Sequence, residues 1–293
     1  MSEPKSLGIR LDSPEVFREA AERVRALSRR WASAHPIEVW IAAAERVAST
    51  LASGKLSDGT DLAKYVEFDL IPAARLVRLA WGLERLEHIG GAVKRELNQM
   101  VRDRDHLYHS EYLIHLAVRI SENGQREVEV VATAAGTPDL AIPSENFCIE
   151  CVTREISSTR QSMKEAFEHA DAKFKVYLAG KPDWLGVVAV DLGVCGSPSF
   201  PEIAKIGPSL QELSADLDMN FALFPSVSAA IVGWIAAELV EDTSSGNCAR
   251  LYVQPVIAVP YAKADVRRLV ALDSTFRPWP QGPVRVAKRQ KGR

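Results

Sequence analysis

The sequence contains little cysteine, no long apolar run and almost no net charge. Four cysteines in 293 residues do not predict a disulfide framework, so a reducing compartment is expected. No run approaches the roughly eighteen apolar residues of a membrane span. The first residues, MSEPKSLGIRLDSPE, lack the apolar segment of a signal peptide. We therefore expect a soluble, cytoplasmic protein with no membrane partner.

Several common catalytic motifs are also missing. The sequence has no G-x-x-x-x-G-K-[ST], no G-x-G-x-x-G and no G-x-S-x-G. Nucleotide hydrolysis and serine-esterase chemistry therefore lack support. The net charge of −2 gives no overall indication of nucleic-acid binding. The charge is uneven, however: residues 261–293 hold nine Lys/Arg against two Asp, a local net charge of +7 that leaves −9 for the rest.

The remaining composition is that of an ordinary globular protein, with 47% apolar and 25% charged residues. Helix-start signals at Ser13-Pro14-Glu15 and apolar residues at helical spacing predict a helical region over residues 1–104. Its many arginines are interpreted as a solvated face paired with nearby acids, or alternatively as a surface for backbone phosphates. Alternating strand and helix patterns predict an α/β core over residues 105–262. Residues 263–293 read as a flexible basic tail.

The most informative stretch runs from Thr137 to Thr153 and reads TPDLAIPSENFCIECVT. A short apolar strand, 140–142, is followed by the turn residues Pro143-Ser144-Glu145-Asn146 and a second strand, 147–153. Since side chains alternate along a strand, Cys148, Glu150 and Val152 should share one face. Glu150 is an acid among apolar neighbours, and burying it is unfavourable unless a cation or hydrogen-bond donors meet it.

If the two strands pair as a hairpin, Asp139 comes close to Glu150. Two carboxylates that converge at the edge of a sheet form a hard-oxygen site suited to Mg²⁺ or Mn²⁺. The elements around the hairpin are a helix from Asp105 to Ile120, a strand from Arg126 to Thr133, a long helix from Ser158 to Leu178 and a buried strand from Leu185 to Leu192.

Pro138-Asp139 followed by Glu150 on the next strand resembles the motif of the PD-(D/E)XK nuclease superfamily. The order helix, three strands, helix, strand is also similar to the core of that superfamily. The resemblance implies a restriction-endonuclease-like fold, a mixed sheet flanked by helices, preceded here by the N-terminal helical region. The motif lysine is missing, because Val152 stands in its place.

The resemblance implies metal-dependent hydrolysis of phosphodiesters, with DNA favoured over RNA as the substrate. Asp139 and Glu150 would hold the Mg²⁺ or Mn²⁺ ion, and Glu111 on the preceding helix would match an acid that completes the site. In this superfamily the lysine can move to the following helix, where Lys164 is favoured over Lys173. A protein partner such as a helicase or a specificity subunit is implied by the same analogy.

Simpler interpretations stay open for these residues. Asp139 alone suits a turn, and Glu111 alone suits the surface of an amphipathic helix. Without the motif lysine, the alternative function is a catalytically degenerate nuclease fold that binds nucleic acid or a protein partner.

Two further sets of residues have spacings found in metal sites. Cys148 and Cys151 have the spacing of a zinc ligand pair, but on a strand they point to opposite faces and are better interpreted as buried thiols. Glu111 and His115 are one helical turn apart, with no evident third ligand. In the tail, Arg285, Lys288, Arg289 and Lys291 are predicted to add salt-sensitive contacts to nucleic acid.

Overall fold

The computed structural model describes residues 13–29, 31, 35–53, 62–86, 89, 91–103, 106–124, 126–131, 136–153, 159–195, 210–242, 248–258 and 283–285. The α-helices are α1 (Pro14–Ser28), α2 (Ile37–Ser53), α3 (Leu62–Tyr65), α4 (Ile71–Arg85), α5 (Gly91–Met100), α6 (Leu107–Gly124), α7 (Thr159–Tyr177) and α8 (Leu210–Leu223). The strands are β1 (Glu129–Val130), β2 (Leu140–Ile142), β3 (Phe147–Thr153), β4 (Leu185–Cys195), β5 (Val227–Asp242), β6 (Cys248–Ala258) and β7 (Pro283–Arg285). A π-helical segment, η1 (Val66–Leu70), leads into α4, and a 3-10 turn, η4 (Pro143–Glu145), joins β2 to β3.

The strands form one mixed sheet whose spatial order follows the chain, from β1 to β7. Strands β3, β4 and β5 are parallel, while β1 and β2 on one side and β6 and β7 on the other pair antiparallel with their neighbours. Helix α7 follows β3 and precedes β4 along the chain, and α8 follows β4 and precedes β5. Each helix is part of the crossover connection that two neighbouring parallel strands require. The predicted α/β class and the order helix, three strands, helix, strand are confirmed.

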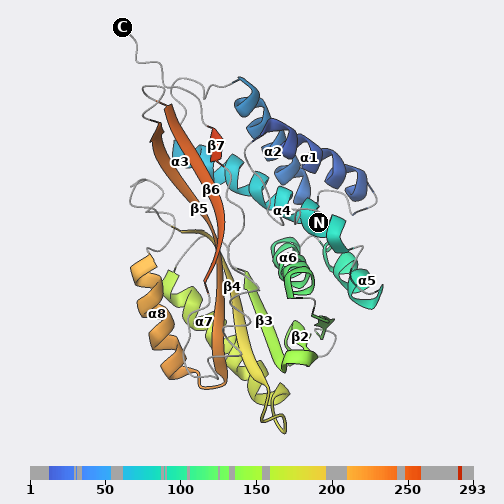
Figure 1. The fold of residues 1–293 in the computed structure, drawn as a ribbon, viewed down its shortest axis with the longest axis vertical. Coiled ribbons are helices and arrows are strands. Elements are labelled where there is room, and N and C mark those ends of the chain that lie inside the picture. The colour runs from blue at the N-terminus through green and yellow to red at the C-terminus, as the bar shows by residue number, and fades with distance from the viewer. Residues whose placement is uncertain are drawn as a thin grey trace, which may run out of the picture.

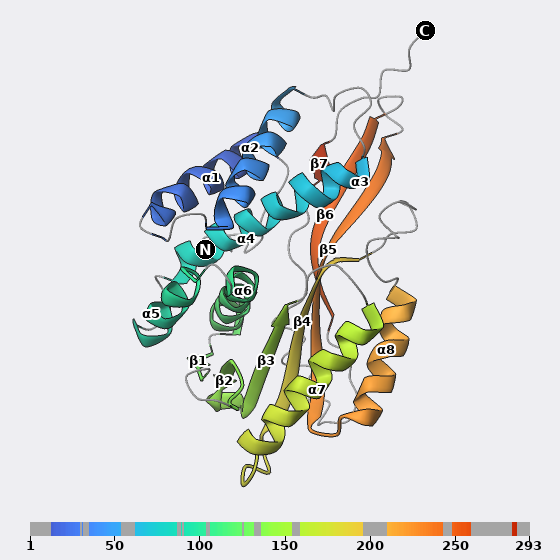
Figure 2. The ribbon, with the colours of Figure 1, turned by 180° about the vertical axis from the view of Figure 1, so that it is seen from behind.

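Helices cover both faces of the sheet (Figures 1 and 2). Along β4, Val188 and Val190 pack in one apolar cluster with α7 and α8, whereas Val187 and Ala189 pack in the other with α6. This alternation explains why residues 187–190 of β4 are all apolar, because both faces of the strand are buried there. It also assigns α6, which carries Glu111, and α7, which carries Lys164 and Lys173, to opposite faces of the sheet.

The N-terminal helices share a core with the sheet. A single cluster contains Phe17 of α1, Trp40 of α2, Leu76 of α4, Leu113 of α6 and Ile149 of β3. The predicted helical region is therefore present, and it packs as a layer over the α6 face (Figure 2). On its outer side, exposed arginines pair with exposed acids, as Arg25 does with Glu45 at 2.6 Å, which fits the solvated-face interpretation.

Two predicted segments differ in the structure. Only residues 129–130 of the predicted strand over 126–133 form a strand among the described residues. The predicted flexible tail contains β7, in which Arg285 pairs with Arg250 of β6.

In the part of the chain that is described, no helix is both long and apolar enough to cross a membrane.

Candidate functional site

The β2–β3 hairpin places Asp139 beside Glu150. The strands pair Leu140 with Ile149 and Ile142 with Phe147, so the next step of the register sets Asp139 opposite Glu150. The backbone N–H of Asp139 donates to the carbonyl of Ile149 at 3.1 Å, which extends the pairing by that step. Both side chains are buried, with exposed fractions of 6% for Asp139 and 3% for Glu150. The structure thus places the two predicted acids next to each other, with both side chains buried.

The turn that makes this hairpin follows from its residues. Pro143 opens the 3-10 turn, and Asn146 closes it in the left-handed region at φ 56°. Asn is among the few residues other than glycine that adopt this conformation readily. Strand β3 then alternates as predicted: Cys148 packs on the α7 side and Ile149 on the α6 side.

Helix α7 supplies a cation to Glu150. Lys173 Nζ lies 2.7 Å from Glu150 Oε1, and His169 Nε2, one helical turn earlier, lies 3.2 Å from the same oxygen. Lys164, which the sequence analysis favoured, is exposed and stands nine residues before Lys173, roughly 13 Å along the helix axis. The lysine beside Glu150 is therefore Lys173, and the preference for Lys164 is corrected.

Helix α6 approaches the pair from the other side of the sheet. His109 Nε2 lies 3.6 Å from Asp139 Oδ1. The other oxygen of that carboxylate, Oδ2, accepts a hydrogen bond from the backbone N–H of Cys151 at 2.8 Å. Neither histidine belongs to the sequence motif. The sequence does indicate that His169 and Lys173, four residues apart on one helix, lie on the same helical face. It gives no comparable indication for His109.

Burial and charge change the acidity of Glu150. Burial, and next the negative charge of Asp139, raise the pKa of Glu150 to about 7, although Lys173 and His109 act to lower it. One of its oxygens, Oε2, is buried and has no hydrogen-bond partner among the described residues. The carboxylate pair is therefore short of positive charge and has an oxygen to offer to a cation.

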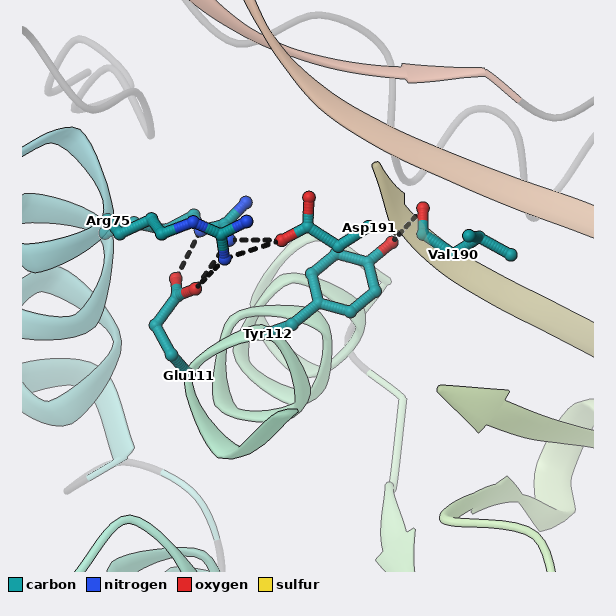
Figure 3. A network of polar contacts seen from close by, with 6 residues as sticks. Arg75, Glu111, Tyr112, Val190 and Asp191 are labelled. Atoms are coloured by element: carbon teal, nitrogen blue, oxygen red, sulfur yellow. Dashed lines mark hydrogen bonds and ion pairs between the residues drawn. The ribbon is translucent and has the colours of Figure 1, made fainter. Parts of the chain in front are cut away.

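Glu111 lies elsewhere, in a buried cluster of four charged side chains (Figure 3). Arg78 contacts both Glu111 and Asp191 through Nη2, at 2.6 and 2.8 Å, and its Nε contacts Glu111 Oε1. Arg75 Nη1 lies 3.0 Å from Asp191 Oδ2 and 3.3 Å from Glu111 Oε2. Both oxygens of Glu111 are thus engaged by arginine.

These contacts correct two expectations for Glu111. The side chain is fully buried, so Glu111 is not a surface residue of an amphipathic helix. It is also committed to the two arginines and does not join Asp139 and Glu150. The sequence signal for the cluster was Asp191, an acid in the apolar strand LGVVAVDL, together with two arginines at i,i+3 on the mainly apolar helix α4.

Aromatic side chains of α6 complete the surroundings of this cluster. The guanidinium groups of Arg75 and Arg78 lie 5.1 and 5.6 Å from the ring centres of Tyr108 and Tyr112. The Tyr112 hydroxyl donates to the carbonyl of Val190, a longer contact at 3.4 Å (Figure 3). Burial alone would lower the pKa of Arg78, but the charges of Glu111 and Asp191 outweigh it and raise the pKa. The cluster is a neutral set of two cations and two anions that ties α4 and α6 to β4.

The other predicted site residues are placed as follows. Cys148 and Cys151 are free, buried thiols. Of the tail bases, Arg285 lies in β7, while Lys288, Arg289 and Lys291 fall outside the described residues. Within the described ranges, no group of three or more His, Cys, Asp or Glu side chains is arranged to hold a metal ion. Of the three acids predicted to hold the metal, Asp139 and Glu150 lie together and Glu111 does not.

Comparisons of this chain with known protein families, with curated proteins and with solved structures found no match.

Proposed function

We propose that this chain is a metal-dependent nuclease whose site is formed by Asp139, Glu150 and Lys173. The observation that carries the proposal is their convergence: two buried carboxylates on adjacent strands, with a lysine 2.7 Å from one of them. Lys173 would take the part of the motif lysine that Val152 replaces, reaching Glu150 from the following helix. The fold would then be of the restriction-endonuclease type.

The residues present fit a Mg²⁺ or Mn²⁺ ion. Both ions prefer carboxylate oxygens, and Mg²⁺ in particular is often bound by one or two carboxylates while the rest of its ligands are waters and substrate phosphates. Glu150 Oε2, buried and without a hydrogen-bond partner among the described residues, and Asp139 Oδ1 would be the protein ligands. A bound divalent ion supplies a more acidic water and offsets negative charge that develops on the phosphate.

The chain's own residues would position the reactants around these oxygens. The Cys151 N–H holds one oxygen of Asp139, and Lys173 holds one oxygen of Glu150, so each carboxylate keeps a fixed orientation. Lys173 also provides a positive charge beside the place where the attacking water would stand. Preorganised charge of this kind stabilises a transition state because it does not have to reorient during the reaction.

The competing function is a catalytically degenerate nuclease fold that binds nucleic acid or a protein partner. The observation that favours it is the engagement of Glu111 by Arg75 and Arg78, which leaves two acids where a third was expected. DNA as the preferred substrate, and a helicase or specificity subunit as a partner, remain proposals by analogy with the superfamily.

Cleavage of plasmid DNA by the purified chain with Mg²⁺ or Mn²⁺ tests the proposal. Asp139→Asn and Glu150→Gln should abolish cleavage and weaken metal binding in calorimetry. Lys173→Ala should lower the cleavage rate on the order of 10²-fold, the size of losing one electrostatic contact in the transition state. A wild-type chain as inactive as these variants with either metal would instead support the degenerate fold.

Lys175→Ala is the matched control for Lys173→Ala. Lys175 lies on the same helix, is largely exposed and pairs with Asp171 at 2.6 Å, so its loss should leave cleavage unchanged. Equal loss of activity in both lysine variants would point to a general effect of positive charge on DNA binding, and would contradict a specific role for Lys173.

A further inference from the structure

The two carboxylates are buried beneath three side chains that can donate hydrogen bonds. Asp139 and Glu150 are 6% and 3% exposed, whereas the side chains beside them are more open: Lys173 21%, His109 23% and His169 60%. These three donors are therefore neighbours of the carboxylates that solvent can reach. We call His109, His169 and Lys173 the rim of the site.

The rim comes from helices on both faces of the sheet, at the end of the β2–β3 ladder. His109 comes from α6, and His169 and Lys173 come from α7, on the opposite face. The ladder between β2 and β3 ends at the pair of Leu140 with Ile149, and beyond it the Cys151 N–H bonds to the Asp139 side chain rather than to a strand. Each of the two imidazoles thus lies beside a different carboxylate of the pair, His109 beside Asp139 and His169 beside Glu150.

Each histidine is the more distant of the two partners at its carboxylate. Glu150 Oε1 has Lys173 at 2.7 Å and His169 at 3.2 Å. Asp139 has the Cys151 N–H at 2.8 Å, while His109 stays at 3.6 Å, beyond hydrogen-bond length. If both histidines turned their N–H groups toward a bound ligand, Glu150 would keep its contact with Lys173 and Asp139 its hydrogen bond from the Cys151 N–H. A neutral imidazole still has one N–H to donate, so this role needs no change of protonation.

The charges around the site set the condition for such a third group. Asp139, Glu150 and Lys173 together carry −1 when both acids are ionised, which repels a phosphodiester. With a divalent cation the sum becomes +1, which attracts one. Phosphate binding at the rim should therefore depend on a divalent ion. The hydrogen bonds to the phosphate should come from neutral or positively charged side chains.

We propose that His109 and His169 bind the non-bridging oxygens of the substrate phosphate, one from each face of the sheet. This inference rests on the proposed nuclease function and assigns the substrate-contacting residues that the sequence motif does not contain. The ligand is a backbone phosphodiester, bound edge-on between α6 and α7. Base identity plays no part in these two contacts.

The first test uses variants that keep or remove the donor. His109→Leu and His169→Leu should each lower cleavage on the order of 10²-fold, whereas His109→Gln and His169→Gln, whose amides still donate an N–H, should recover most of that loss. His106→Leu is the control, because His106 is 63% exposed and pairs with Asp103. A merely structural role for the histidines would show equal losses for Leu and Gln, and that result would overturn the inference.

The second test does not depend on cleavage. The full chain, with ¹³C-labelled histidine and Ca²⁺ present, is titrated with a short oligothymidylate while the imidazole resonances are followed by NMR. The signals of His109 and His169, assigned with the Gln variants, should shift, and that of His106 should not. Shifts in a chain that cleaves nothing would overturn the nuclease proposal and uphold the phosphate contacts. A chain that cleaves DNA while neither signal moves would overturn the contacts and keep the nuclease.

Discussion

Glu111 and Glu150 show how one residue type takes two roles in two surroundings. Both are buried glutamates within apolar segments. Glu111 faces two arginines that engage both of its oxygens, so its charge is neutralised within the protein. Glu150 faces a single lysine and a second acid, Asp139, so its charge is only partly neutralised. That difference makes Glu150 the better candidate for binding a cation or a proton.

The raised pKa of Glu150 predicts how stability depends on pH without metal. Between about pH 4.5 and about 7 the folded chain keeps a proton on Glu150 that the unfolded chain releases. The contribution of Glu150 to stability is therefore fully present below this range and is lost as the pH rises through it. Relative to Glu150→Gln, the wild-type free energy of unfolding should fall by an amount on the order of 3 kcal/mol over this range. Urea denaturation in chelator at several pH values measures the difference. If the free energy of unfolding of the wild type instead rises relative to that of Glu150→Gln over this pH range, the raised pKa of Glu150 is contradicted.

At the scale of elements, the site depends on how closely α7 lies against β4. Phe174 of α7 is fully buried, and a Cβ added at Gly186 would lie 2.5 Å from its ring. Glycine at this position thus lets the helix approach the sheet. Because Lys173 directly precedes Phe174, the same approach sets the reach of Lys173 to Glu150.

Gly186→Ala should therefore destabilise the protein by about 1–3 kcal/mol, the usual effect of overpacking, and should also lower cleavage. Thermal and urea unfolding measure the first effect, and the plasmid assay measures the second. Gly91→Ala is the matched control, since a Cβ there meets nothing within 4 Å and the residue begins α5. Equal stability of the two variants would mean that α7 adjusts at no cost, contrary to the packing described.

At the scale of the whole molecule, the N-terminal helices and the sheet share one apolar core. They share a single apolar cluster, and Arg75 and Arg78 of α4 neutralise Glu111 and Asp191 within it. Removing the partner of a buried ion is strongly destabilising, by about 3–5 kcal/mol for a pair. The predicted boundary at residue 104 therefore separates segments of the chain that do not separate in space.

A fragment of residues 105–293 should consequently fail to fold on its own. It would leave Glu111 and Asp191 without their arginines and expose the face that α4 covers. Circular dichroism and calorimetry should show a cooperative unfolding transition for the full chain and none for the fragment. A fragment that unfolds cooperatively at the temperature of the full chain would establish residues 105–293 as an independent domain.

Local patterns determined much of this protein. Periodicity and turn residues predicted the helix start at Pro14, the 143–146 turn, the alternation along β3 and the buried strand β4, because each depends on neighbours in sequence. The hairpin pattern was also enough to predict that Asp139 meets Glu150. Which lysine reaches Glu150, and what surrounds Glu111, lay beyond local patterns.

Those two outcomes were decided by tertiary structure. Lys164 and Lys173 lie on the same helix, and the packing of α7 on the sheet, with Phe174 against Gly186, places Lys173 beside Glu150. Glu111 and Asp191 are eighty residues apart, and they meet two arginines of α4 only when the helical layer closes over the sheet. A local pattern encodes which side chains share a face. Which distant charges are buried together depends on how whole elements pack, because a buried charge requires a partner from whichever element lies against it.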